Sequence, residues 1–457
     1  MLQNSELHQN HFDTYNDQDL AKVLEGYSTL EIVDILSNQQ PEERIRIFNS
    51  LTPKHAVSVF EYLPINLQIE IIFSLQPKQI SRVLDNLSPD DRTAFLEYLP
   101  PEVVNQLIKF LSPVEKSVTL KLLGYPEGSV GRLMTPDYIA VKMDWTIEKV
   151  LQYIREHGRD SETINVIYVV DDNGILIDDL HIRELLLARR DSIIEDLADH
   201  KFIALSVQDD EEKAVQVFRK YNRVALPVID NKGLLLGIVT IDDILQIADA
   251  VDTEDMQKIG GMEALDEPYM QTSFFTLIQK RVGWLTILFI GETLTASAMA
   301  YYQDEISKAV VLALFIPLII SSGGNSGSQA STLIIRAMAL GEIKLKDWWR
   351  IMKREILAGL VLGSVLGLIG FFRVALWSSF STIYGPHWLL VAFTIFFSLI
   401  GVVMWGTFTG SMLPLILRKL NFDPATSSAP FIATLVDVTG LIIYFNIAML
   451  ILKGIML

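Results

Sequence analysis

Pro430-Phe-Ile-Ala-Thr434-Leu-Val-Asp437-Val-Thr-Gly440 lies within a long apolar run, residues 431–452, whose one acidic or basic residue is Asp437. A carboxylate at membrane depth is costly, so it is usually retained because it faces a partner or a water-filled path. Two explanations fit this position: a protonated aspartate that bonds to a neighbouring helix, and a cation site. Under the second explanation, every other segment has to be examined for its relation to Asp437.

Charge and hydrophobicity are unevenly distributed along the 457 residues, a length that allows two or three domains. Residues 281–457 carry 12 Lys and Arg against 8 Asp and Glu, whereas residues 1–280 carry 26 against 47. From residue 282 onward, several apolar stretches approach the roughly 20 residues that a membrane-spanning helix needs. The composition therefore predicts an acidic soluble half followed by a slightly basic membrane half.

The composition also excludes several classes of protein. The net charge of −17 and the lack of a basic stripe argue against a nucleic-acid partner. An acidic surface suits cations, although solubility alone explains much of it. Without cysteine there is no disulfide framework, thiolate metal site or cysteine nucleophile. The sequence shows no nucleophile–base pair, HExxH motif or phosphate loop, so we expect no enzyme. Residues 1–19 are polar, so we expect a loose tail and no signal peptide.

Prolines divide residues 20–130 into short intervals. Six of them are 11 to 13 residues apart: Pro53, Pro64, Pro77, Pro89, Pro100 and Pro113. Because proline is tolerated in the first turn of a helix, each interval fits one short helix. Two such helices make a unit of about 24 residues, which is typical of a helical solenoid. Irregular helical packing explains the spacing nearly as well, and both interpretations predict an interaction module.

Residues 131–248 change to short strands that alternate with helices, and two segments match at an offset of 59 residues. Ile167-Tyr-Val-Val-Asp171-Asp-Asn-Gly174 aligns with Leu226-Pro-Val-Ile-Asp230-Asn-Lys-Gly233. The second copy continues as Leu234-Leu-Leu-Gly237-Ile-Val-Thr240-Ile-Asp242-Asp243, running from a strand into a helix. This pattern resembles a tandem pair of CBS domains.

The resemblance to CBS domains implies a sensor that could bind an adenine nucleotide such as ATP, while dimerisation alone is the alternative. The first copy departs from the pattern. Asp178 and Asp179 replace the Gly–Ile pair of the second copy, and His181 stands where that copy has Thr240. At least one of the two nucleotide sites is therefore in doubt.

An acidic connecting segment, residues 249–280, precedes the membrane half. Residues 242–267 contain nine acidic residues and one lysine. Asp249, Asp252 and Asp255 are three apart, so a helix would place them on one stripe. A divalent cation that prefers oxygen ligands, such as Mg²⁺, would offset their repulsion. A solvated helix face is the alternative, and Gly260-Gly261 predicts the end of this helix.

We expect five membrane spans, over residues 282–301 (with Glu292 in the middle), 306–340, 356–377, 388–417 and 431–452. Basic residues cluster after the second and fourth spans, whereas the loops after the first and third carry only Lys308 and Arg373. By the positive-inside rule, the N-terminal half lies in the cytoplasm and the C-terminus outside. This predicts a multi-pass protein of the cell membrane (the inner or plasma membrane).

Glycines serve two purposes in the membrane half. Gly359, Gly363 and Gly367 are spaced by four and predict close helix packing, as do Gly401, Gly406 and Gly410 less regularly. Ser321-Ser-Gly-Gly-Asn325-Ser-Gly-Ser-Gln329 instead predicts irregular backbone that lines a wet cavity. Asn325, Gln329 and backbone carbonyls would then supply neutral oxygen near Asp437, a ligand set that suits Mg²⁺ better than zinc or copper.

Over nearly its whole length the chain resembles the MgtE family of magnesium channels. The membrane motifs that carry the resemblance are Gly-Gly-Asn325-x-Gly, Leu-Ile-Ile-Arg336-Ala, Asp423-Pro424-Ala and Pro430-x-x-Ala-Thr434-x-x-Asp437-Val-Thr-Gly440. The resemblance implies an all-α N-terminal solenoid, an α/β tandem CBS pair, a long connecting helix and a five-helix transmembrane domain at 281–457. It also implies a homodimer in membrane lipid, with Asp437, Asn325 and Thr434 around hydrated Mg²⁺ on the two-fold axis.

In the family, intracellular Mg²⁺ binds between the N-domain, the CBS pair and the connecting helix and closes the pore. The matching positions are Glu212, Asp243, Glu254 and Asp255, with Asp249, Asp252, Asp90 and Asp91 as weaker substitutes. Asn222, Gln246 and Val251 stand where some relatives are acidic, which predicts a weaker or rearranged sensor. Bridging ions would shift the population towards a closed state. Two alternatives stay open: a membrane-anchored Mg²⁺ or nucleotide sensor without transport, and a channel for another divalent ion such as Co²⁺.

Overall fold

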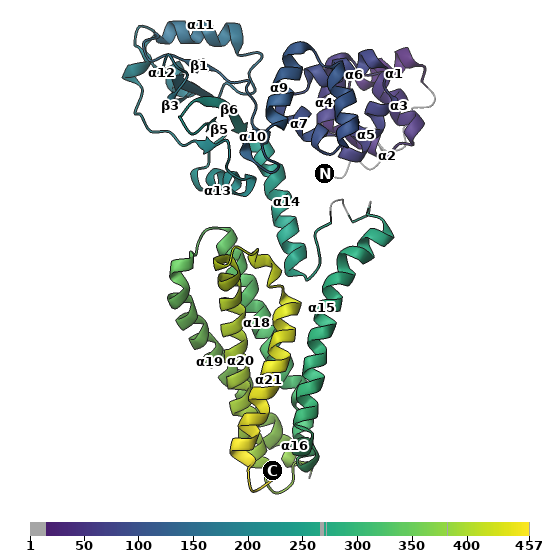
Figure 1. The fold of residues 1–457 in the computed structure, drawn as a ribbon, viewed down its shortest axis with the longest axis vertical. Helices are drawn as coiled ribbons and strands as arrows, with labels where there is room; N and C mark the ends of the chain where they lie inside the picture. Colours follow the sequence, from purple (N-terminus) through teal and green to yellow (C-terminus); the bar gives the residue numbers. More distant parts are fainter. Residues whose placement is uncertain (1–14, 266–268, 271, 382, 457) are drawn as a thin grey trace. The chain divides into compact units, whose positions relative to one another are not determined.

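The computed structural model describes residues 15–265, 269–270, 272–381 and 383–456. The chain divides into two compact units, an N-terminal unit (Met1–Ala248) and a membrane unit (Asp249–Leu457) (Figure 1). Residues 1–14 of the predicted tail lie outside the described residues. The first helix already begins at Asp17, where the side chain of Asn16 accepts a hydrogen bond from the backbone N–H of Asp19.

Short helices form the first part of the N-terminal unit: α1 (Asp17–Leu24), α2 (Thr29–Asn38), α3 (Pro41–Asn49), α4 (Pro53–Tyr62), α5 (Ile65–Ser74), α6 (Pro77–Asn86), α7 (Pro89–Glu97), α8 (Pro101–Leu107), the 3-10 turn Ile108–Phe110 and α9 (Pro113–Leu123). Four of the six predicted prolines, Pro53, Pro77, Pro89 and Pro113, begin a helix, and the other two, Pro64 and Pro100, directly precede one. Helix α2 packs on α4 and α4 on α6, while α3 packs on α5, which is the neighbour pattern of a solenoid.

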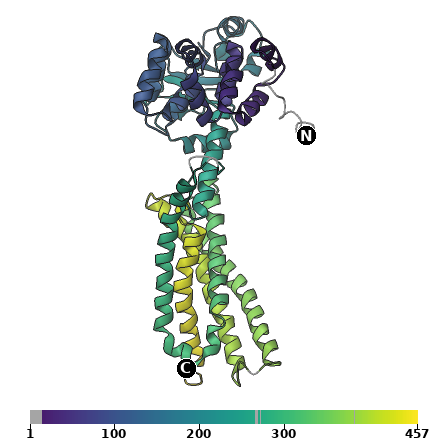
Figure 2. The same cartoon turned by 90° about the vertical axis from the view of Figure 1, so that its right-hand side faces the viewer.

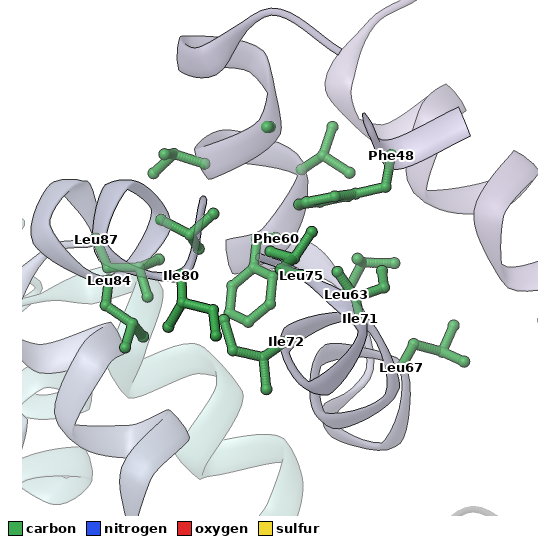
Figure 3. Packing of buried hydrophobic residues seen from close by; sticks show 14 of the residues in the cluster. Phe48, Phe60, Leu63, Leu67, Ile71, Ile72, Leu75, Ile80, Leu84 and Leu87 are labelled. Atoms are coloured by element: carbon green, nitrogen blue, oxygen red, sulfur yellow. The ribbon is translucent and has the colours of Figure 1, made fainter. Parts of the chain in front are cut away.

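The buried faces of these helices form one apolar core (Figure 3). Phe60 of α4 lies at its centre, with the ring of Phe48 at 6.3 Å and that of Phe95 at 5.3 Å, both in edge-to-face geometry. Aromatic pairs of this kind add about 0.5–1.5 kcal/mol beyond the burial of area. The core therefore holds α3, α4 and α7 in fixed positions relative to one another.

The second part of the N-terminal unit consists of two small α/β repeats. The first contains α10 (Val130–Leu133), β1 (Ala140–Val141), α11 (Ile147–His157), β2 (Val166–Val170), β3 (Leu176–His181), α12 (Ile182–Leu187) and the 3-10 turn Ile194–Asp196, and the second contains β4 (Leu205–Ser206), α13 (Glu211–Tyr221), β5 (Ala225–Ile229) and β6 (Leu235–Thr240). The strand orders are β1-β2-β3 and β4-β5-β6. Val169 pairs with Asp178 in the first sheet and Val228 pairs with Gly237 in the second, which confirms the offset of 59 residues.

Helix α14 (Ile241–Ile259) follows β6 directly, and its last eleven residues belong to the membrane unit. The helix ends before Gly260-Gly261, as predicted. Gly261 has a positive φ of 77°, which glycine adopts without strain. The helix is therefore shorter than the predicted segment 249–280, whose residues 266–268 and 271 lie outside the described residues.

The membrane unit continues with α15 (Phe274–Tyr301), α16 (Gln303–Lys308), α17 (Val310–Ala313), α18 (Ile316–Ala339), the 3-10 turn Leu345–Asp347, α19 (Trp348–Ser378), α20 (Trp388–Lys419), the 3-10 turn Pro424–Thr426 and α21 (Ala429–Leu452). Five segments of the described chain are long and apolar enough to cross a membrane: Phe274–Tyr301, Val310–Ala339, Leu345–Ser378, Trp388–Lys419 and Ala429–Leu452. Helix α20 packs against α18, α19 and α21, and α15 packs along α21 (Figures 1 and 2). Arg373, expected in a loop, lies inside α19.

The prediction of irregular backbone at residues 321–329 was wrong, because α18 runs through this stretch without a break. The glycines bring α18 into backbone contact with α20. A Cβ atom on Gly406 would lie 2.3 Å from the carbonyl oxygen of Gly323, and one on Gly410 would lie 2.1 Å from that of Gly327. The helix satisfies its own backbone groups, so no wet cavity is needed for them.

The second glycine pattern has the predicted role. Cβ atoms on Gly359, Gly363 and Gly367 of α19 would lie 2.3–2.8 Å from atoms of α20. Small residues at four-residue spacing thus allow these two long helices to pack closely. Together with the contacts of α18, this makes α20 the central helix, against which α18, α19 and α21 pack.

Candidate functional site

Asp437 lies half-buried on α21, where this helix crosses the glycine-rich part of α18. A Cβ atom on Gly324 would lie 3.7 Å from Oδ1 of Asp437 and 3.3 Å from Cβ of Ala433. Glycine at position 324 therefore leaves room for the carboxyl group between the two helices. The prediction of a cavity lined by irregular backbone fails, but the predicted proximity of the Gly-Gly-Asn325 stretch to Asp437 is present.

The two other predicted pore residues flank this point. Thr434 precedes Asp437 by three residues on α21, so both lie on one face of the helix. Asn325 follows Gly324 on α18, is exposed, and donates a long hydrogen bond of 3.5 Å from Nδ2 to Oγ of Ser321. Carboxylate, amide and hydroxyl oxygens thus come from two packed helices, a donor set that suits a hard cation such as Mg²⁺.

Side-chain hydrogen bonds fix α21 in place. Trp405 Nε1 of α20 donates to Oγ1 of Thr439 at 2.8 Å, and the Tyr444 hydroxyl donates to the carbonyl oxygen of Leu312 at 2.8 Å. At the start of the helix, the Ser328 hydroxyl donates to the carbonyl oxygen of Ala429 at 2.9 Å. Asp437 is therefore held by a helix that is anchored on both sides of it.

The N-terminal unit contains a second concentration of acids, which we call the acidic cluster. It joins helices of the solenoid to the CBS repeats and consists of Glu61 on α4, Asp90 and Asp91 in the first turn of α7, Glu162 before β2, and Asp242 and Asp243 at the start of α14. Asp90 is 7% exposed, and its Oδ1 atom has no hydrogen-bond partner within the described chain. A buried carboxyl oxygen without a partner is costly, and a cation or its water would satisfy it.

The pKa values of the acidic cluster reflect this crowding. Burial, then the charges of Asp243 and Asp91, raises the pKa of Asp90 well above its ordinary value. Burial also raises the pKa of Asp243 to about 7, although the hydroxyl of Thr240 donates to it at 2.8 Å and opposes the shift. The pKa of Glu61 is raised to about 7 by burial and by the charges of Asp91 and Glu162.

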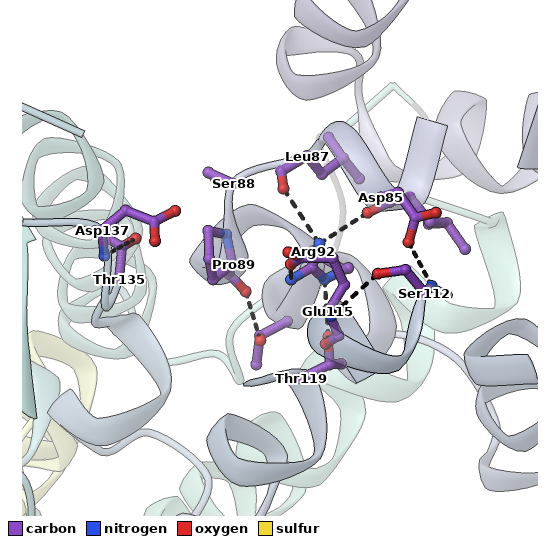
Figure 4. A network of polar contacts seen from close by, with 12 residues as sticks. Asp85, Leu87, Ser88, Pro89, Arg92, Ser112, Glu115, Thr119, Thr135 and Asp137 are labelled. Carbon is purple, nitrogen blue, oxygen red and sulfur yellow. Dashed lines mark hydrogen bonds and ion pairs between the residues drawn. The ribbon is translucent and has the colours of Figure 1, made fainter. Parts of the chain in front are cut away.

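Arg92 fixes the helix that carries Asp90 and Asp91 (Figure 4). This guanidinium is fully buried. It donates from Nε to the Thr119 hydroxyl at 2.8 Å, from Nη1 to the carbonyl oxygen of Leu84 at 2.9 Å, and from Nη2 to Glu115 at 2.5 Å. Helix α7 is thereby tied to α6 and α9. Arg92 is committed to these partners and does not neutralise the acidic cluster.

The acids of α14 within the membrane unit have basic partners instead. Lys258 Nζ lies 2.6 Å from Glu254 and 2.7 Å from Asp423, and Arg336 of α18 lies 3.1 Å from Asp252. Burial alone would lower the pKa of Lys258, but the hydrogen bonds to Asp423 and Glu254 raise it above its ordinary value. These ion pairs connect the end of α14 to α18 and to the segment before α21.

The predicted regulatory residues therefore fall into separate places. Asp90, Asp91 and Asp243 meet in the acidic cluster, Glu212 lies in the first turn of α13, and Asp249, Asp252, Glu254 and Asp255 lie on α14. In residues 15–456, apart from those the structure leaves undescribed, no three His, Asp or Glu side chains converge closely enough to hold a bare metal ion. Mg²⁺ usually keeps several waters, so it can bind to such a looser arrangement.

Sequence analysis missed Glu61 and Glu162 of the acidic cluster and the partner role of Lys258. The first two lie in different elements, 101 residues apart, and no motif links them. Lys258 is the only basic residue among residues 242–267, and a single base among nine acids could have indicated that it forms ion pairs with some of them.

In the first CBS repeat the unusual residues form a contact of their own. Asp179 pairs with Arg223 at 3.2 Å, and Nη1 of Arg223 lies 3.1 Å from Nε2 of His181. Asp178 is fully buried and accepts a hydrogen bond from the N–H of His200 at 2.9 Å. Because Arg223 lies between α13 and β5 of the second repeat, its contact with Asp179 joins the two repeats and occupies these side chains.

Comparisons with known proteins match three regions of the chain. The MgtE family, described as a divalent cation transporter, matches residues 316–447, the MgtE intracellular N domain matches 27–128, and the CBS domain matches 130–191 and 194–249. The magnesium transporter MgtE of Thermus thermophilus is 37% identical over 73% of this chain and 72% of its own length. The magnesium transporter MgtE of Enterococcus faecalis is 34% identical over 73% of this chain and 71% of its own length.

Two solved structures each match about half of this chain. The soluble part of a magnesium transporter covers 53% of this chain and 96% of its own, with a TM-score of 0.50 and 24% identity, and so shares the fold. A cytosolic domain of the Mg²⁺ channel MgtE, solved in complex with ATP, covers 51% of this chain and 95% of its own, with a TM-score of 0.49 and 31% identity. From the extent and identity of the sequence matches, this chain belongs to the MgtE family of magnesium transporters.

Proposed function

We propose that this chain forms a Mg²⁺-selective channel or transporter that imports magnesium across the cell membrane and is closed by intracellular Mg²⁺. The observation that carries the proposal is the carboxyl group of Asp437, placed at membrane depth against Gly324 of a second spanning helix. A carboxylate at this depth is retained where a cation passes or binds. The related proteins of Thermus thermophilus and Enterococcus faecalis are named magnesium transporters.

We further propose a homodimer in which Asp437, Asn325 and Thr434 of each protomer face the two-fold axis. Asn325 is exposed and Asp437 is half-buried in the single protomer, so both are accessible to a partner copy or to water. Two carboxylates across an axis can hold Mg²⁺ through its retained waters, which avoids most of the cost of dehydration. The orientation we propose has the N-terminal unit in the cytoplasm and the C-terminus outside.

Closure would use the acidic groups outside the membrane. The orphaned Oδ1 of Asp90 and the raised pKa values around it fit a site for regulatory Mg²⁺ in the acidic cluster. Divalent ions would offset the repulsion there and on α14, and so favour the arrangement in which they bind. The ion pairs of Lys258 and Arg336 give α14 a mechanical connection to α18 and to the start of α21.

We also propose that the CBS pair binds a nucleotide. The second repeat keeps Gly237, Thr240 and Asp243, whereas in the first repeat Asp179 pairs with Arg223 of the second. We therefore expect ATP, if it binds, to occupy one site per chain. Equilibrium dialysis of the N-terminal unit with labelled ATP, beside R223A, tests this stoichiometry.

The main test is Mg²⁺ flux into proteoliposomes, with D437N beside wild type and D304N as control. Asp304 lies exposed on α16, away from the proposed path. We expect saturable flux that is lost in D437N and kept in D304N. Equal flux in D437N and wild type would move the path away from Asp437. Absence of flux in all three, at low internal Mg²⁺ and with folding verified, would favour a sensor without transport. Competition by Co²⁺ at equal concentration distinguishes a channel for another divalent ion.

A further inference from the structure

Glu292 lies in the middle of α15, a helix of 28 residues that is long and apolar enough to span a membrane. None of the roles described above uses it. Because a second carboxyl at membrane depth is as costly as the first, its position needs a reason. The surroundings of α15 supply one.

Helix α15 contacts α21 beside Glu292. A Cβ atom on Gly291 would lie 2.7 Å from Cγ2 of Thr434, so glycine at 291 is what allows the contact. This contact places Glu292, the residue after Gly291, beside the turn of α21 that carries Thr434 and Asp437. Among the described residues, no base is close enough to Asp437 to offset its charge.

A second observation on the same helix face is independent of the two acids. Thr295 is 8% exposed and is the one residue of α15 that is buried in the described chain. Its hydroxyl has no hydrogen-bond partner among the described residues. Thr295 follows Gly291 by four residues, so it lies on the stripe that faces α21. A buried hydroxyl without a partner here is satisfied if water or a hydrated ion enters beside it.

Electrostatics favour a cation at this point over an empty pair. Two carboxylates side by side in a medium of low dielectric constant repel each other strongly. A salt bridge would remove the repulsion, but neither α18 nor α21 places a base there. A hydrated divalent cation removes it without any base, and it bonds to carboxylates through its waters.

We propose that Glu292 is a cation-binding residue of the ion path, which holds a hydrated divalent cation together with Asp437, with the Thr295 hydroxyl bound to the same water shell. Each protomer then contributes two carboxylates, one from α15 and one from α21, to the selection of divalent over monovalent ions. This inference rests on the proposed function, because it assigns a further residue to the same path.

The experiment measures Mg²⁺ flux into proteoliposomes as a function of Mg²⁺ concentration, with and without competing Na⁺. The variants are E292Q, E292D and T295V, with D437N as reference and E305Q on α16 as control. For E292Q we expect the Mg²⁺ concentration at half-maximal flux (K0.5) to rise about tenfold. This change corresponds to roughly 1.4 kcal/mol of lost binding free energy. Maximal flux should fall less than K0.5 rises, and Na⁺ should compete better. E292D keeps the charge and should restore most of the affinity, and T295V should raise K0.5 by a smaller factor.

The outcomes separate this inference from the proposed function. If D437N abolishes flux while E292Q keeps the wild-type K0.5 and Na⁺ sensitivity, the proposed function stands and the role of Glu292 is refuted. If D437N transports normally, the proposed function itself fails. If E292Q does not fold, E292D decides: a wild-type K0.5 with altered Na⁺ competition supports the proposal. A loss of maximal flux in E292D with K0.5 unchanged would indicate a structural role and overturn it.

Discussion

The acids of the acidic cluster and the acids on the membrane-unit part of α14 are neutralised in different ways. In the acidic cluster, Asp90, Asp243 and Glu61 face other carboxyl groups, and burial raises their pKa values. On the part of α14 in the membrane unit, Asp252 and Glu254 instead face Arg336 and Lys258. Carboxylates without a basic partner attract cations from solution. A carboxylate that pairs with a lysine or arginine of the same chain needs no such cation. The first arrangement suits sensing, and the second suits transmission.

The stability of the membrane unit depends on close packing between its helices. Disrupting the contact between α18 and α20 should therefore give the largest loss of stability. G410V places a side chain where a Cβ already lies 2.1 Å from the Gly327 carbonyl oxygen, and backbone cannot yield cheaply. We expect the free energy of unfolding to fall by at least about 3 kcal/mol, the upper end of the usual cost of overpacking. Thermal unfolding of detergent-solubilised protein, followed by size-exclusion chromatography, measures it.

G283A is the matched control for this substitution. The nearest atom to a Cβ on Gly283 is Oε1 of Glu263 at 3.8 Å, an ordinary contact, and alanine favours the helix. The unfolding temperature of G283A should equal or exceed that of wild type. Equal stability of G410V and G283A would show that the contact between α18 and α20 does not hold the unit together.

The acidic cluster should control closure without affecting permeation. In D90N/D243N the repulsion is reduced and two carboxylate ligands are lost, so the Mg²⁺ concentration for half-closure should rise roughly tenfold, or about 1.4 kcal/mol. Flux at low internal Mg²⁺ should remain that of wild type. Flux from proteoliposomes with buffered internal Mg²⁺ measures both quantities. The control E102Q/E127Q, at exposed positions of the N-terminal unit, should leave the Mg²⁺ concentration for half-closure unchanged. An equal shift in this control would show that the effect comes from the overall charge and not from the acidic cluster.

Several features were predictable because they follow from local chemistry. Proline at first helical positions predicts α4, α6, α7 and α9, and the repeat at an offset of 59 residues predicts the strand registers of both CBS sheets. The position of Asp437 in an apolar run predicts its importance, since a membrane-spanning helix is a local property.

Other features depend on contacts between distant segments. A glycine-rich stretch at membrane depth fits a broken helix and a tightly packed one equally well from sequence. The continuous helix α18 is explained by Gly406 and Gly410 of α20, about 80 residues further along the chain, which face its glycines and allow the two helices to pack closely. The same holds for Glu61 and Glu162, which join the acidic cluster through tertiary packing, and for Glu292, which approaches Asp437 because Gly291 meets Thr434.

The connection at Lys258 should give a smaller effect than the acidic cluster. K258E breaks the contacts to Asp423 and Glu254 and places like charges together. Partly exposed ion pairs contribute about 0.2–1 kcal/mol, so we expect a change of about 1.4-fold to fivefold in the Mg²⁺ concentration for half-closure. The double variant K258E/D423K restores opposite charges and should recover most of it. Additive effects of the two substitutions would show that the pair does not transmit closure.

The smallest effect concerns the pH dependence of stability in the N-terminal unit. Glu61 and Asp243 have pKa values of about 7 in the folded chain, above the ordinary values of 4.5 and 3.8. The folded state therefore binds more protons than the unfolded state at intermediate pH, and stability falls as pH rises. The stabilisation is fully present below about pH 4 and is lost by about pH 7 to 8. Without divalent ions, the unfolding temperature should drop by roughly a few degrees between pH 5.5 and 7.5.

E61Q isolates one group in this titration. The glutamine side chain at position 61 is uncharged at every pH, so the decrease in unfolding temperature between pH 5.5 and 7.5 should be smaller than in wild type. Added Mg²⁺ should also flatten the wild-type curve, because a divalent ion stabilises the ionised carboxylates that protons otherwise neutralise. Na⁺ at matched ionic strength should do so less. A wild-type curve that rises from pH 5.5 to 7.5 in chelator would contradict the crowding of these acids, and with it the basis for a Mg²⁺ site in the acidic cluster.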